Sequence, residues 1–281
     1  MEHRKRSVNP GAWESCLSVG FPTDAASDSR LKPRSVLANA YGSTLLEMTF
    51  SNRFLSALGA NTLESLRNWL EPVAIRPDHV VYRMGDRVEH VYFVESGLLL
   101  RLAMVEDGRT VSVGVTGREG AAGAANALSG LPSFHQVTGH VEGEALRIEA
   151  GRFADVINAS KEARKVADVY LDALTISSDL TTTCLAFHPL SARLSTALLN
   201  AQDANGGGGK VLATQELLAS MFAVQRTSVT SLATSMERAG LIRTGRGAVE
   251  ILDRAGLERS ACGCYDRQAR LWADLWGAVD A

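Results

Sequence analysis

TQELLASMFAVQRTSVTSLATSMERAGLI, residues 214–242, contains two helical patterns separated by a tight turn. Its apolar residues recur at spacings that let two crossed helices share one small core. They are Leu217, Leu218, Met221, Val224, Val229, Leu232 and Met236. The outward residues at the start of the second helix are small, polar or cationic, which suits a helix end inserted into a DNA major groove. The segment therefore predicts a helix-turn-helix that binds DNA.

Ten residues of this unit are candidate DNA contacts. Arg226 is the principal one, because a guanidinium group can donate two hydrogen bonds to guanine. The others lie at the start of the first helix, on the second helix and on the segment that follows: Gln215, Gln225, Thr227, Ser228, Thr230, Ser231, Thr244, Gly245 and Arg246. Three have an alternative role, since Ser228 would also serve as a helix cap, Gln215 as a solvated residue and Arg246 as a turn residue.

The flanking sequence extends this unit to residues 188–262. Residues 241–252 predict two short strands joined by a glycine turn, which makes the unit a winged helix-turn-helix. Within this unit, a helix over residues 191–204 comes before the helix-turn-helix and ends in the glycine run 206–209. That run lacks the Lys-Ser/Thr pair of a phosphate-binding loop, so we expect a flexible turn.

Residues 71–150 have a different pattern, in which short β-branched and aromatic runs alternate with turn residues. Strands of this length, with turns about every ten residues, predict an antiparallel jelly-roll barrel. Asp107-Gly108 is a hairpin signal within it. Short helices are expected before the barrel, at 53–58 and 62–70, the second capped by Asn61 or Thr62. The predicted fold class is α+β, with a barrel domain and its flanking helices over residues 47–160.

A long helix is predicted over residues 161–187, where side chains recur every seven positions. Such a row is typical of a helix that pairs with a copy of itself. The expected dimer seam consists of Val166, Tyr170, Ala173, Ser177, Leu180, Cys184 and Phe187. The alternative is a helix packed on its own barrel.

Composition narrows the classes of function. The chain has 281 residues and a formal net charge of −2, which argues against a charge-driven, histone-like binder but not against a regulator with a local basic patch. No apolar run approaches the roughly 20 residues of a membrane span, and no apolar segment follows the charged start, so we expect a cytoplasmic protein. Residues 1–46 predict a flexible extension.

The four cysteines, Cys16, Cys184, Cys262 and Cys264, are scattered along the chain. A reducing cytoplasm disfavours a disulfide framework, and a single Cys-x-Cys pair lacks the spacing of a zinc knuckle. We therefore expect ordinary thiols and no metal site. A redox or metal role for the Cys262–Cys264 tail is the alternative. No converging set of catalytic residues appears, so the chain is not expected to be an enzyme.

The order of parts resembles the Crp/Fnr family of bacterial transcription regulators over roughly residues 50–262. The resemblance rests on residues 79–86 with 91–97 in the barrel, 185–187 with 192–194 around the end of the long helix, and 225–229 at the second helix. It implies a cyclic-nucleotide-binding-like sensor domain and a homodimer that reads an inverted repeat in double-stranded DNA. The tail, residues 263–281, predicts a helix packed on the DNA-binding unit or on the dimer, or a docking site for RNA polymerase.

Departures from the family affect the expected effector. The Gly-Glu-Leu element that holds ribose in cyclic-nucleotide-binding members falls on residues 121–124, which lack a carboxylate. The Arg-Ser pair that holds the cyclic phosphate falls near residues 133–136, which lack an arginine, and a buried phosphate needs such donors. We therefore expect an effector other than cyclic AMP. At the DNA, Thr227 stands where relatives commonly carry glutamate, which implies a different operator.

The other cofactors of the family are not expected either. Cys16 is the one cysteine before the barrel, whereas iron–sulfur members need a group of them there. His79, His90, His135 and His140 are isolated, which does not favour haem. An effector site is predicted between the barrel and the long helix, at Ala122, Gly123, His135, Ser178 and Asp179. The alternative is a pocket filled by side chains and constitutive DNA binding.

A cupin-like metal-binding barrel is the rival from another class. It needs closely spaced histidines that converge with a carboxylate on one metal. His135 and His140 are five residues apart, and that spacing places them on opposite faces of a strand. The rival also leaves the helix-turn-helix unexplained.

Overall fold

The structure is a computed structural model that describes residues 50–204 and 210–280. The expectations for residues 1–46, for Cys16 and for the glycine run 206–209 lie outside the described residues. The described residues belong to one compact unit. None of the helices in this part of the chain combines the length and the apolar character needed to cross a membrane.

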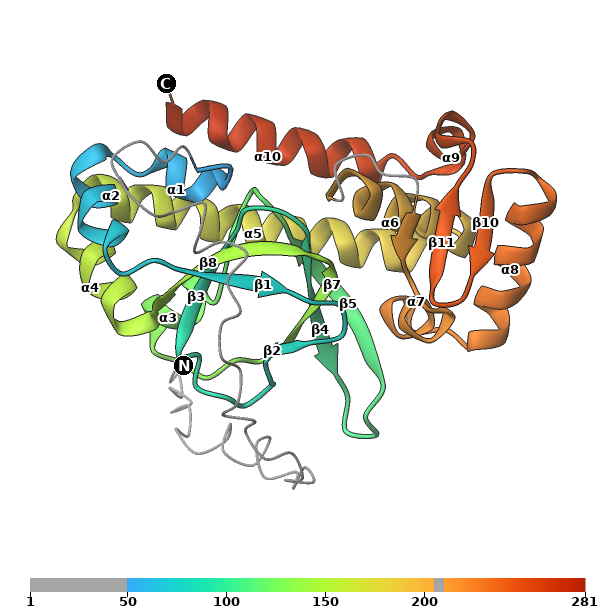
Figure 1. Cartoon of the computed structure of the whole chain (residues 1–281), viewed down its shortest axis with the longest axis horizontal. Helices are drawn as coiled ribbons and strands as arrows, with labels where there is room; N and C mark the ends of the chain where they lie inside the picture. The colour runs from blue at the N-terminus through green and yellow to red at the C-terminus, as the bar shows by residue number, and fades with distance from the viewer. Residues whose placement is uncertain (1–49, 205–209, 281) are drawn as a thin grey trace, which may run out of the picture. The chain divides into compact units, whose positions relative to one another are not determined.

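The described N-terminal region forms two four-stranded antiparallel sheets, with strand orders β1-β8-β3-β6 and β2-β7-β4-β5 (Figure 1). The strands are β1 (Glu71–Ile75), β2 (Val80–Tyr82), β3 (His90–Val94), β4 (Leu98–Met104), β5 (Thr110–Thr116), β6 (Ala121–Ala122), β7 (Gln136–Val141) and β8 (Gly143–Glu149). Gly108 has φ +83° in the hairpin between β4 and β5, a conformation that favours glycine. The predicted antiparallel jelly roll is confirmed.

Four short helices gather on one side of the barrel (Figure 1): α1 (Arg53–Ala57), α2 (Ala60–Arg67), α3 (Ala124–Ser129) and α4 (Ala150–Ala159). Asn52 fixes the first of them, because its side chain accepts from the Leu55 backbone N–H and donates to the Val94 and Gly120 carbonyls. The expected cap of the second helix is wrong. Gly59 occupies that position and makes no side-chain cap, so α2 begins before Asn61 and Thr62.

α5 (Lys161–Phe187) is the longest described helix and has the bounds expected from the sequence. Ser160 caps its start by accepting from the Ala163 N–H, and Pro189 follows its end. The N-terminal half packs on an aromatic core in which the Tyr170 ring lies 5.2 Å from that of Phe54, centroid to centroid. Hydrophobic burial of these rings holds α5 to the barrel domain.

The seven residues of the predicted dimer seam do not form a free face of α5, so this prediction is wrong. Val166, Tyr170, Ala173 and Ser177 are all buried within the chain itself. Leu180 and Cys184 line an internal cavity, and of the seven residues only Phe187, which is 81% exposed, lies open to solvent. A seven-residue repeat indicates that one stripe of a helix is covered, but it does not say by what. Here the barrel and a later helix cover it.

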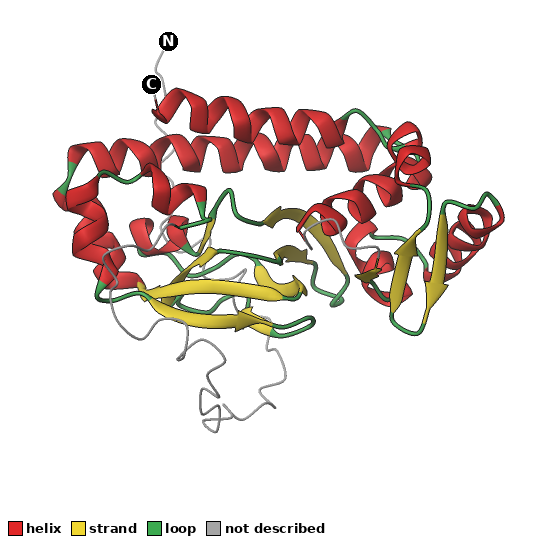
Figure 2. Cartoon of the chain, turned by 45° about the horizontal axis from the view of Figure 1, so that its top comes forward, coloured by secondary structure: helices red, strands yellow, loops and turns green. Residues whose placement is uncertain are grey.

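That later helix is α10 (Cys264–Asp280), which lies beside α5 over much of its length (Figure 2). Trp276 is 3% exposed and joins the aromatic core, with its ring 6.3 Å from those of Tyr170 and Phe54. The end of the tail therefore packs on the long helix and the barrel domain. Its start contacts the DNA-binding unit, where the Tyr265 hydroxyl donates to Asp203 at 2.6 Å, so the expected packing on that unit is wrong only for the end of α10.

The C-terminal unit contains α6 (Leu190–Ala204), β9 (Lys210–Leu212), α7 (Gln215–Phe222), α8 (Arg226–Arg238), β10 (Ile242–Gly245), β11 (Ala248–Ile251) and α9 (Arg254–Ser260). Strands β10 and β11 pair antiparallel through the expected glycine turn, and β9 pairs with β11 as a third strand that the sequence analysis missed. The predicted winged helix-turn-helix is confirmed.

Candidate DNA-binding surface and effector site

The turn between α7 and α8 sets the angle of the two helices. Thr214 caps α7 by accepting from the Leu217 N–H at 3.0 Å. Ala223 ends it in the left-handed conformation, with φ 52°, and the Val224 N–H then donates to the Ala219 carbonyl. α8 starts at Arg226 with Val229, Ala233 and Met236 buried against α7 and the wing. Core packing thus leaves the opposite face of α8 free.

The outward face of α8 carries six of the ten predicted contacts. All six are exposed: Gln225, Arg226, Thr227, Ser228, Thr230 and Ser231. Ser228 does not cap its helix, because the cap residue is Gln225 and no side chain bonds there. The face therefore presents hydroxyl, amide and guanidinium groups of the kind that bind base edges and phosphates.

Arg226 lies at the first position of this face. Its Nη1 is 3.6 Å from a carboxylate oxygen of Glu216, but the two side chains are 67% and 74% exposed. Solvent screens so open a pair, so it contributes little and would not hold Arg226 against a nucleic acid. Gln215 is not simply solvated, since its Oε1 accepts from the Thr230 hydroxyl at 2.7 Å. That bond joins the starts of α7 and α8.

The wing contributes the remaining candidates. The Thr244 hydroxyl donates to Glu237 Oε1 at 2.7 Å, and the Thr244 N–H donates to the same oxygen. These bonds to Thr244 lower the pKa of Glu237. Gly245 and Arg246 are exposed at the turn, so the wing tip is free while its base is fixed to α8. A hollow of about 340 Å³ lies between α7, α8 and the wing.

The predicted effector residues are only partly brought together. Ala122 is buried in the barrel core, and Gly123, with φ +90°, leads into α3. His135 precedes β7, and burial and the nearby Arg101 charge lower its pKa. Ser178 faces the barrel from α5. Asp179 is exposed and makes no part of this group, because the next residue on a helix points about 100° away.

Arg101 is the residue that the sequence analysis missed. It lies on β4, and its Nη2 donates to Ser178 Oγ at 2.7 Å and to the Val113 carbonyl at 3.3 Å. Its Nε is buried without a hydrogen-bond partner. Burial of an incompletely paired guanidinium is costly, so the barrel does contain a cation that an anion would stabilise. The available signal was a single arginine in the apolar run LLLRLAM of residues 98–104.

The barrel histidines do not form a converging metal site. His140 is 3% exposed on β7, and its pKa is lowered to about 4 by burial. Among the described residues, the one group of three or more potential metal ligands lies elsewhere, at Cys184, His188, Cys262 and Cys264. The expectation that the cysteines are scattered is therefore wrong for three of the four, which meet in this group. The cupin-like rival also leaves the C-terminal winged helix-turn-helix unexplained.

Comparison with known proteins defines the class. Residues 72–160 match the model of the cyclic nucleotide-binding domain, and residues 192–260 match that of the Crp-like helix-turn-helix domain. A search of the curated proteins found no match. The two matched domains make this chain a regulator with a sensor barrel and a DNA-binding head. It belongs to the Crp/Fnr family of transcription regulators.

Solved structures agree on the fold. A transcriptional regulator of the crp/fnr family from Eubacterium rectale is similar with a TM-score of 0.61 at 15% identity, covering 74% of this chain and 97% of the other. FixK2 from Bradyrhizobium japonicum gives 0.58 at 13% identity, covering 69% and 98%. A CRP-family transcriptional regulator from Thermus thermophilus gives 0.56 at 23% identity, covering 67% and 96%.

Proposed function

We propose that this regulator acts as a homodimer that reads an inverted repeat in double-stranded DNA through α8. The free polar face of α8, with Arg226 at its start, is the observation that carries the proposal. Two such helices would enter successive major grooves about 34 Å apart. Arg226 would supply roughly 1–3 kcal/mol of discrimination through bonds to guanine, and the wing tip would contact the backbone.

The dimer would form on a different face of α5 from the predicted seam. The side away from the barrel and α10 carries two exposed large apolar side chains, Ile176 at 48% and Phe187 at 81%. Thr183 lies seven residues, or about two helical turns, after Ile176 and is exposed as well. Covering these groups with a copy of the same face would remove apolar surface from water.

The effector would be an anion other than cyclic AMP. Ser133 lies where cyclic-nucleotide-binding members carry the Arg-Ser pair that holds the cyclic phosphate. Its hydroxyl already bonds within the chain, since it donates to the His135 carbonyl at 2.7 Å and accepts from the His135 N–H. Arg101 offers a buried N–H group, and its bond to Ser178 links β4 to α5. An anion that displaced Ser178 from Arg101 would change the contact between barrel and long helix, and so bias the position of the DNA-binding units.

Selection of bound sequences from random duplex DNA tests the proposal. The wild-type chain should enrich an inverted repeat, and Arg226→Ala should weaken its binding by about tenfold or more at near-physiological salt. Arg109→Ala is the matched control, because it removes the same charge from a barrel hairpin where the side chain is 82% exposed. Enrichment only after adding cell extract would support the effector. No enrichment in either condition would refute sequence-specific reading.

The dimer face has its own test. Sedimentation should report a dimer for the wild-type chain and a shift towards monomer for Phe187→Asp, because a buried unpaired carboxylate is costly. Trp69→Asp is the control, since that side chain is also exposed, at 48%, but lies on the barrel side. A wild-type monomer at the concentration that binds the operator would contradict the dimer.

A further inference from the structure

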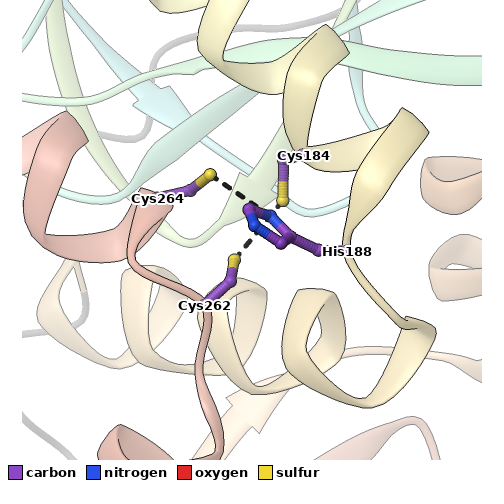
Figure 3. Close-up of side chains that lie close together, drawn as sticks. All are labelled: Cys184, His188, Cys262 and Cys264. Atoms are coloured by element: carbon purple, nitrogen blue, oxygen red, sulfur yellow. Dashed lines mark hydrogen bonds between the residues drawn. The ribbon is translucent and has the colours of Figure 1, made fainter.

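Three cysteines and one histidine converge at the C-terminal end of α5 (Figure 3). The Sγ atoms of Cys184 and Cys262 are 3.5 Å apart, and Cys264 Sγ is 3.5 Å from His188 Nδ1. One ligand atom from each of the four residues lies within 4.8 Å of all the others. The group is therefore compact enough to surround a single atom.

The backbone brings these residues together from two distant segments. Cys184 lies in the last turn of α5 and His188 follows four positions later, where the His188 N–H still bonds the Cys184 carbonyl. Residues four apart share one face of a helix. Cys262 lies in the short link between α9 and α10, and Cys264 is the first residue of α10. The sequence spacing is thus Cys-x3-His in one segment and Cys-x-Cys in the other.

The group is largely buried and sulfur-rich. Cys262 and Cys264 are each 8% exposed, and Ala192 packs against them together with Cys184. All three thiols are free. Thiol groups are weak hydrogen-bond partners, so apolar packing alone gives no reason for three sulfurs and an imidazole nitrogen to face one another.

We propose that Cys184, His188, Cys262 and Cys264 bind one Zn²⁺ ion as a structural site. Four ligands with three sulfurs and one nitrogen are a common structural zinc set. At a Zn–S distance of about 2.3 Å, tetrahedral geometry places neighbouring sulfurs about 3.8 Å apart. The Cys184–Cys262 sulfur separation of 3.5 Å lies close to that value, and all four ligand atoms lie within 4.8 Å of one another. A cluster with two or more irons would spread its ligands over several metal centres and requires larger separations. Hard cations such as Mg²⁺ and Ca²⁺ prefer oxygen ligands.

Two neighbouring features support thiolates here. Thr196 Oγ1 lies 3.3 Å from Cys262 Sγ, at hydrogen-bonding distance, and outer contacts of this kind orient metal ligands. Cys264 is the first residue of the 17-residue helix α10, where the helix dipole favours negative charge. The first feature would orient Cys262, and the second would favour a zinc-bound thiolate at Cys264.

The ion would tie the start of α10 to the end of α5, just before α6 begins the DNA-binding unit. These segments are 74 residues or more apart in sequence, from His188 to Cys262, so one ion would close a long loop. The site is separate from the α8 surface and from Arg101. Its existence does not depend on the proposed DNA reading.

Metal analysis of the full-length chain, purified in reducing buffer without chelator, tests this assignment. We expect about one zinc per chain and no inorganic sulfide. Cobalt exchanged into the site should give the thiolate charge-transfer band and the intense visible absorption of tetrahedral sulfur coordination. The cobalt spectrum reads out the ligand set directly, without any measure of DNA binding.

Substitutions distinguish the proposed zinc ligands from residues that do not bind the ion. Cys262→Ser and Cys264→Ser should each lose most of the zinc, whereas Cys16→Ser, the same change at the remaining cysteine, should keep it. His188→Cys replaces one zinc ligand with another and should retain zinc with a cobalt spectrum shifted towards four sulfurs. Thr196→Val should weaken zinc binding by roughly tenfold. Circular dichroism confirms that each variant is folded.

Four results would overturn the assignment. The first is a folded wild-type chain that contains no zinc and takes up no cobalt, and the second is stoichiometric iron with sulfide. The third is a disulfide among Cys184, Cys262 and Cys264 in protein freshly purified in reducing buffer, and the fourth is full zinc content in the double variant Cys262→Ser, Cys264→Ser.

Discussion

The two ends of the α5–α10 pair are held by different chemistry. At one end Trp272, Trp276 and Tyr170 stack, and Trp276 also meets Phe54 edge-on at 6.3 Å between ring centroids. At the other end lies the group of three cysteines and one histidine (Figure 3). The first end buries large apolar surfaces, and the second buries little but brings four ligand atoms together.

The difference indicates which end is permanent and which is conditional. Aromatic burial depends on no cofactor, so the end near Trp276 remains packed wherever the chain is folded. Metal coordination depends on zinc and on reduced thiols, so its contribution at the end near Cys264 is present only when both are. The conditional end is the one that adjoins the DNA-binding unit, so its state bears on how that unit is held.

The largest expected effect comes from removing the aromatic end. Trp276→Ala should lower the free energy of unfolding by about 5 kcal/mol, because it leaves a cavity in a closed core. Trp276→Phe is the control. It keeps most of the apolar volume and removes an indole N–H that has no hydrogen-bond partner, so its cost should be far smaller. Chemical denaturation measures both, and equal losses would show that volume at Trp276 does not matter.

Zinc removal should act only on the other end. With free zinc a thousandfold above the dissociation constant, chelation should lower the free energy of unfolding by about 4 kcal/mol. Amide hydrogen exchange should quicken around Cys184–Arg193 and Cys262–Gln268, while residues near Trp276 remain protected. The variant Cys262→Ser, already without the ion, should not respond to chelator. A uniform increase in exchange along α10 would mean that the two ends are not separable.

A cavity of about 110 Å³ adjoins the cysteine end, and the residues that line it include His140, Ser177 and Gln268. Burial lowers the pKa of His140 to about 4, below its usual 6.5, and its Nδ1 has no hydrogen-bond partner. The unfolded chain therefore takes up the proton first as the pH falls. Stability should be complete above pH 6.5 and fall by roughly 3 kcal/mol as the pH drops from 6.5 to about 4.

Denaturation midpoints across that pH range measure this effect. His140→Gln should flatten the profile, and the measurement is best made on Cys262→Ser as background, since acid also releases zinc. An unchanged slope in His140→Gln would assign the acid sensitivity to another group.

The smallest effect should come from one hydroxyl. The Tyr170 hydroxyl accepts from the Ala121 N–H at 2.9 Å and donates to the Ala121 carbonyl at 3.3 Å. Tyr170→Phe keeps the stacked ring but leaves that N–H unpaired, so we expect a loss of about 1–2 kcal/mol with zinc content unchanged. Thermal unfolding with metal analysis checks both parts. A loss as large as that of Trp276→Ala would show that the hydroxyl, rather than the ring, holds this end.

The sequence by itself determined the parts and their order. Short β-branched and aromatic runs between turn residues such as Asp107-Gly108 predicted the barrel strands. The spacing of apolar residues in 214–242 predicted α7 and α8, because these signals are local and repeat within a few residues. The exposed face of α8 followed from the same periodicity, so Arg226 and its neighbours were accessible to prediction.

Only the tertiary structure decided which surfaces meet. The heptad row along α5 indicated a covered stripe, yet the barrel and α10 cover it, and no local pattern carries that information. Arg101 was not predicted as a site residue, and only the fold places the Ser178 Oγ atom of α5 2.7 Å from its Nη2. Cys184 and Cys262 are 78 residues apart in sequence and 3.5 Å apart in space. Their meeting depends on how α10 packs against α5, which long-range burial of aromatic side chains sets and sequence spacing does not.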